Sequence, residues 1–174
     1  MAISLYDVSV GTYLQVVAGA RGVLEKGRAY LQEKNIDPAS IVEMRLAPDM
    51  LPFRFQVQSV AYHSLGSIAT LKAGKFAIPS SPPPEHDYEG LQALLAETEA
   101  GLKALTPTEV NACEGREVLF EAGDFKMRFT AVNYVLSFGL PNLFFHAATA
   151  YDILRSKGAP VGKRDFMGPM RLIG

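Results

Sequence analysis

The sequence contains a single cysteine, Cys113, and no tryptophan. One cysteine excludes an intrachain disulfide and any metal site built from several thiolates. The chain also lacks an excess of charge of one sign, because 17 Lys and Arg residues stand against 18 Asp and Glu residues, for a formal net charge of -1. Neutralising nucleic-acid phosphates requires a surplus of basic residues, so we expect no nucleic-acid partner.

Long hydrophobic runs are missing as well. No stretch reaches the roughly 18 apolar residues of a membrane span, and residues 1–10 do not show a basic segment followed by an apolar one. We therefore expect no membrane partner and a cytoplasmic location. The 174 residues are 48% hydrophobic and 20% charged, which is typical of one globular domain over 1–174 that folds without a disulfide.

Apolar residues recur with helical spacing in four long segments. In the first of them, Val10, Val17, Leu24 and Leu31 lie seven residues apart, as on the buried stripe of a bundle helix. Pro141 lies inside the last segment and predicts a kink, because proline removes one backbone hydrogen bond. The predicted helices span residues 4–34, 52–73, 87–105 and 130–157.

The segments between these helices carry start and turn signals. Asp37 before Pro38 predicts a short helix to about residue 45, and Thr106 with Glu109 forms a capping box that opens a single turn. Residues 116–121 and 124–129 alternate like two strands and predict a hairpin. We expect the proline-rich segment 74–87 to be an exposed, stiff connector and the tail 162–166 to be extended over the surface.

Four long helices with a small β-hairpin before the last one predict an all-α four-helix bundle. Aromatic side chains occur on several sides of the last helix, among them Phe144, Phe145 and Tyr151. A helix that is apolar all round is buried all round, so these residues favour a homodimer in which helices pack against their symmetry mates.

Two of the three histidines are candidates for a site. His146 follows Asn142 by four residues on one face of the last helix, and His63 lies at the flank of the apolar stripe of the second long helix. Because bundles build their sites from inward-facing side chains, we expect His63, Asn142 and His146 to converge inside the bundle. His86 lies in the connector and is expected to be solvated.

Three interpretations of this trio are open from the residues alone. The histidines are core residues satisfied by hydrogen bonds, or ligands of a divalent metal, or polar groups of a metal-free pocket for a small-molecule ligand. Cys113 is expected to be an ordinary turn thiol, since the neighbouring Glu114 disfavours a thiolate. Asp152 and the pair Lys163–Arg164 are expected to be charged surface groups.

Five segments together resemble the DinB/YfiT-like superfamily, and more closely one of its bacterial families of unknown function. They are 141–146 (PNLFFH), 149–155 (TAYDILR), 46–50 (LAPDM), 55–59 (FQVQS) and 162–166 (GKRDF). The resemblance spans nearly the whole chain. It implies a four-helix bundle of up-down-down-up topology that is often dimeric.

The resemblance also implies a function class. Better-known members hold a divalent metal with three histidines, and some are thiol-dependent transferases. His63 matches the ligand on the second long helix, His146 matches the second histidine of the pair on the last helix, and Asn142 stands where the first of that pair is found. We therefore expect a divalent-metal protein binding Zn, Ni or Mn, or a degenerate transferase or hydrolase. A metal-free ligand-binding or structural homodimer is the alternative, and whether the chain is an enzyme is left open.

Overall fold

The computed structural model describes residues 3–76, 84–122 and 124–173 of the chain. The connector predicted over 74–87 therefore lies in large part outside the described residues. The elements in chain order are the π-helical turn η1 (Asp7–Gly11), α1 (Thr12–Glu33), α2 (Ala39–Val42), α3 (Phe53–Ala73), β1 (Lys75–Phe76), α4 (Tyr88–Lys103), α5 (Pro107–Asn111), β2 (Glu117–Ala122), β3 (Phe125–Thr130), α6 (Ala131–Tyr134), the π-helical turn η2 (Val135–Gly139), α7 (Leu140–Ser156) and α8 (Lys163–Met167).

Capping side chains begin several of these helices where the sequence predicts. Asp87 accepts a hydrogen bond from the Gly90 backbone N–H at 2.7 Å at the start of α4. Thr106 and Glu109 form the predicted capping box of α5. Such caps satisfy the first N–H groups of a helix, which have no partner within the helix itself.

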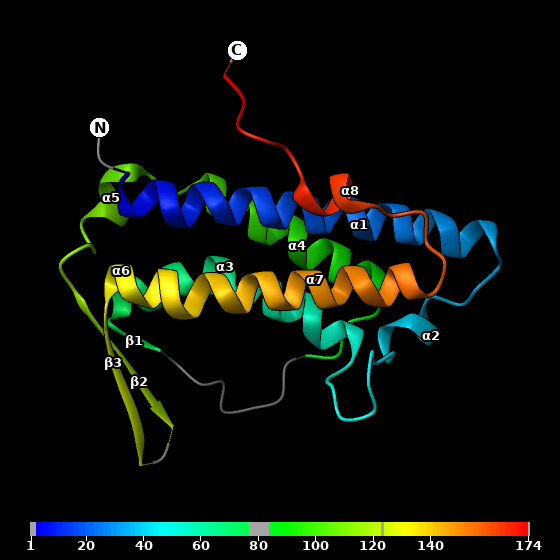
Figure 1. Cartoon of the computed structure of the whole chain (residues 1–174), viewed down its shortest axis with the longest axis horizontal. Helices are drawn as coiled ribbons and strands as arrows, with labels where there is room; N and C mark the ends of the chain where they lie inside the picture. Colours follow the sequence, from blue (N-terminus) through cyan, green and yellow to red (C-terminus); the bar gives the residue numbers. More distant parts are fainter. Residues whose placement is uncertain (1–2, 77–83, 123, 174) are drawn as a thin grey trace.

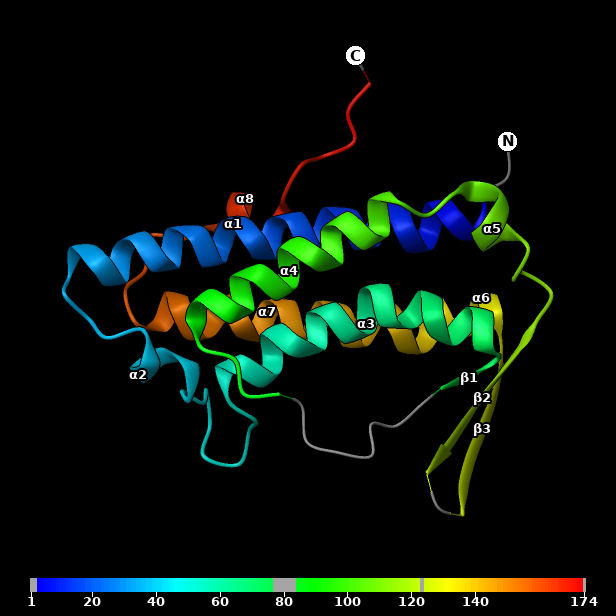
Figure 2. The same ribbon diagram turned by 180° about the vertical axis from the view of Figure 1, so that it is seen from behind.

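Four helices form the bundle, in agreement with the predicted fold. Helices α1 and α7 run in one direction and α3 and α4 in the other, which gives the up-down-down-up order (Figures 1 and 2). Helix α3 packs against α7 and α4, and α1 packs against α4 and α7. The core between them is made of fully buried side chains such as Tyr13, Phe53, Leu95 and Leu143.

The three strands form one sheet in the order β1-β2-β3. It lies at one end of the bundle and extends beyond it (Figure 1). β2 and β3 form the predicted antiparallel hairpin, with Glu117 opposite Thr130. Strand β1, which the sequence analysis did not predict, pairs in parallel with β2 and places Lys75 opposite Leu119. A two-residue strand has no periodicity of its own, so only its partner reveals it.

The last long helix is interrupted just before Pro141. The helical path continues from α6 into α7, but Val135–Gly139 forms a π-helical turn in which the Leu140 N–H bonds to the Val135 carbonyl oxygen. Proline lacks a backbone N–H, and this wider turn is the local irregularity that accompanies it where we expected a kink.

The expectation of an extended tail at 162–166 is wrong. Lys163–Met167 forms the short helix α8, and the Asp165 carboxylate accepts a hydrogen bond from the Gly162 N–H at 2.8 Å. The α8 segment packs on α1, where Gln15 donates a hydrogen bond to the Met167 carbonyl oxygen. Among the described residues, no helix has the length and apolar character needed to cross a membrane.

Candidate functional site

The rings of His63 and His146 lie parallel and close together between two helices of the bundle. His63 comes from α3 and His146 from α7, and these two helices pack directly against each other. The ring centroids are 5.5 Å apart and the ring planes are inclined by only 9°. The predicted convergence of these two histidines therefore agrees with the structure.

Aromatic edges surround the two imidazoles. Tyr62 and Phe138 contact the His63 ring edge-on, with centroids 5.4 and 5.9 Å away. Phe55 and Phe145 contact the His146 ring in the same manner, at 5.9 and 5.3 Å. The π-helical turn before Pro141 carries Phe138, so this irregular stretch forms part of the wall around the pair.

The two rings differ in their hydrogen bonds. His146 Nδ1 lies 2.7 Å from Gln56 Oε1. His63 Nδ1 is buried and has no hydrogen-bond partner among the described residues. A buried polar atom without a partner costs about 1–3 kcal/mol, so this nitrogen is an exception that requires an explanation.

Burial keeps both rings neutral near pH 7. Desolvation lowers the pKa of His63 to about 4, and the nearby His146 adds a smaller effect in the same direction. Desolvation likewise lowers the pKa of His146 to about 4. A neutral imidazole retains a lone pair on one ring nitrogen, which is the form that binds a metal or accepts a hydrogen bond.

Asn142 lies one helical turn before His146, as the spacing predicts, and is half-buried. Its Nδ2 donates a hydrogen bond to the Phe138 carbonyl oxygen at 2.8 Å. Because the helix backbone uses the amide nitrogen, only Oδ1 of Asn142 is a candidate ligand. Within the described part of the chain, no group of three His, Cys, Asp or Glu side chains is placed to hold a metal ion.

Comparison with known proteins identifies the family. Residues 5–167 match the model of a domain of unknown function, DUF1993. The chain belongs to the DUF1993 family. A search of curated proteins finds no match for it.

The fold of this DUF1993 chain has a solved counterpart. It is similar to the crystal structure of a DinB family member protein from Shewanella denitrificans, with a TM-score of 0.80 and 24% sequence identity. The match covers 98% of this chain and 95% of that one. At this identity the likeness establishes the DinB-like fold, as the resemblance in the sequence implies.

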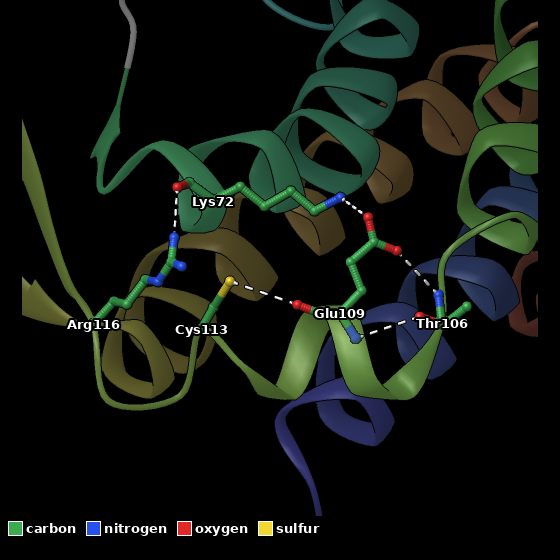
Figure 3. Close-up of polar contacts among 5 residues, drawn as sticks. All are labelled: Lys72, Thr106, Glu109, Cys113 and Arg116. Carbon is green, nitrogen blue, oxygen red and sulfur yellow. Dashed lines mark hydrogen bonds and ion pairs between the residues drawn. The ribbon is translucent and has the colours of Figure 1, made fainter.

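Cys113 of the DUF1993 chain lies beside a cluster of polar contacts that links α5 to the end of α3 (Figure 3). The residue is 2% exposed, and its Sγ lies 3.9 Å from the Glu109 carbonyl oxygen in the preceding helical turn. Nearby, Lys72 pairs with the Glu109 carboxylate, and Arg116 donates to the Lys72 carbonyl oxygen at 2.8 Å. These contacts hold α5 and the start of β2 against the end of α3.

The remaining sequence candidates lie outside the histidine pair. His86 is half-buried rather than fully solvated, and its Nδ1 lies 2.8 Å from Nε2 of Gln58. Asp152 is exposed on α7, and Lys163 and Arg164 are exposed in α8.

Gln56 is the residue of this site whose role the sequence analysis missed. It is 2% exposed and bridges the segment before α3 to His146, because its Nε2 donates to the Leu51 carbonyl oxygen at 2.8 Å. The available signal is a glutamine on an apolar helix, seven residues and two turns before His63. That spacing places Gln56 on the face of α3 that carries His63.

Proposed function

We propose that this DUF1993 chain binds a divalent transition metal between His63 and His146. The observation that carries the proposal is the juxtaposition of two neutral imidazoles, one of which has a buried Nδ1 with no partner in the described part of the chain. Asn142, which stands where the family pattern has a histidine, would supply Oδ1 as a third ligand, and water would complete the shell. A metal site explains why two adjacent histidines are kept buried and neutral at an energetic cost.

The donor set decides which metals fit. Two imidazoles and an amide oxygen are all uncharged, and imidazole suits zinc and nickel, whereas manganese prefers carboxylates. Among Zn, Ni and Mn, the site therefore fits zinc or nickel better than manganese. When bound, such an ion lowers the pKa of a coordinated water or thiol, and this is the chemistry that a transferase or hydrolase of this fold would use.

Elemental analysis of protein purified without an affinity tag or chelator tests the proposal. We expect about one equivalent of zinc or nickel in the wild type and its loss in His63→Ala and in His146→Ala. His86→Ala is the matched control, because His86 bonds to Gln58 outside the pair, and it should retain the metal. A wild-type protein that neither contains nor takes up zinc or nickel would overturn the metal site and favour a metal-free pocket for a small molecule.

We also propose that the chain forms a homodimer through α7 and the turn before it. Three large apolar side chains there are exposed in the single chain, with Leu136 at 50%, Phe144 at 42% and Phe145 at 56%. Large apolar side chains left exposed on neighbouring helical turns are typical of a protein–protein interface.

A further inference from the structure

We propose that Gln56 is a positioning residue that fixes the tautomer of His146 and leaves the Nε2 lone pair of that ring free for a ligand. The part of this inference that concerns a metal rests on the proposed function. The part that concerns the tautomer rests on the hydrogen bonds of Gln56 alone.

The orientation of the Gln56 amide follows from its first partner. The Leu51 carbonyl oxygen accepts hydrogen bonds and cannot donate them, so the amide nitrogen must face it. The amide oxygen of Gln56 then faces His146 Nδ1, at 2.7 Å. Interchanging the two amide atoms would set oxygen against oxygen at Leu51, which excludes the flipped amide.

The tautomer of His146 follows from the second partner. An amide oxygen can only accept, so the hydrogen of this bond belongs to His146 Nδ1. A neutral imidazole carries one ring proton, which leaves Nε2 with the lone pair. Gln56 is 2% exposed, so water does not compete effectively for either of its bonds.

This arrangement is the one that metal-binding histidines commonly use. Such a histidine donates its second ring N–H to a fixed oxygen, which holds the ring in place and makes the ligating nitrogen more basic. Here the fixed oxygen belongs to a glutamine whose other end is held by the backbone before α3. The two hydrogen bonds of Gln56 thus hold the His146 ring of α7 in a fixed position relative to residues 51–56.

The experiment measures the tautomer first, in the metal-free wild type. Long-range 1H–15N correlation spectra of 15N-histidine-labelled protein at pH 7 should show His146 Nδ1 protonated and Nε2 unprotonated. Gln56→Leu removes the acceptor, so the ring should shift toward the other tautomer. Zinc affinity, measured by chelator competition, should fall about tenfold to a hundredfold in that variant.

Gln58→Leu is the matched control. Gln58 lies on the same helix and is also buried, but it bonds to Pro84 and His86 instead of His146. This variant should keep both the tautomer and the zinc affinity of the wild type. If Gln56→Leu does not fold, the wild-type spectrum still decides the first claim.

The outcomes separate this inference from the proposed function. A wild-type His146 protonated at Nε2, or a Gln56→Leu protein with an unchanged tautomer, would overturn the role of Gln56 even if zinc binds. The expected tautomer together with no zinc binding would support Gln56 as the positioning residue and overturn the metal site.

Discussion

His63 exposes only 8% of its surface, and burial lowers its pKa to about 4 from an ordinary 6.5. Between these two values the unfolded chain binds a proton that the folded chain does not. Protonation of this residue therefore does not lower the free energy of unfolding above pH 6.5. As the pH falls from 6.5 toward 4, proton binding to the unfolded chain lowers the free energy of unfolding. A shift of this size corresponds to roughly 3 kcal/mol at full extent.

We therefore predict that the free energy of unfolding of the metal-free protein falls between pH 7 and pH 4.5. Urea denaturation with a chelator present measures it across that range. His63→Gln should reduce this dependence but leave the part that His146 contributes, since burial also lowers the pKa of His146 to about 4. A double variant, His63→Gln with His146→Gln, should remove both parts, while His86→Gln should leave the dependence as in the wild type. An equal slope in the wild type and in His63→Gln would show that this ring does not carry the effect.

At the scale of elements, the close contact between α1 and α8 depends on glycine. A Cβ added at Gly19 would lie 2.5 Å from the Phe166 carbonyl oxygen, which is too close for any side chain. A Cβ added at Gly168 would lie 2.6 Å from the Gln15 carbonyl oxygen of α1. Gly168 also has a φ of 62°, a conformation that favours glycine. The short helix can rest on α1 only because both positions lack side chains.

Gly19→Ala should therefore destabilise the protein by about 1–3 kcal/mol, since the backbone of α8 must move away. Gly22→Ala on the same helix is the control, because a Cβ there meets nothing within 4 Å. That control should be neutral or stabilising by up to about 1 kcal/mol. Urea denaturation compares the two, and equal stability of both variants would contradict the close docking of α8.

At the scale of the whole molecule, the proposed homodimer has a direct test. Light scattering of the wild type should give twice the mass of one chain. Phe144→Glu introduces a charge on the exposed face of α7 and should give the single-chain mass. Phe125→Glu is the control, since Phe125 is 59% exposed in the hairpin, away from α7, and should leave the dimer intact. A wild type of single-chain mass would overturn the proposal.

The parts of the fold that the sequence predicted are those with local causes. The helix from Phe53 follows from Pro52 and the apolar periodicity after it, and the hairpin follows from the alternation of its side chains. Both signals act over a few residues. The convergence of His63 and His146 was predicted because each lies on an inward helical face. Strand β1 and helix α8 were missed because each is stabilised by a partner distant in sequence.

The sequence by itself thus determined the four helices, the Asp87 cap of α4 and which histidines face the bundle interior, since all of these depend on spacing within one segment. Only the tertiary structure decided that the two rings lie parallel and 5.5 Å apart, and that Gln56 bonds to His146 across 90 residues of chain. The reason is physical. Periodicity sets which face a residue occupies, whereas the axial alignment of two packed helices sets which residues on those faces meet.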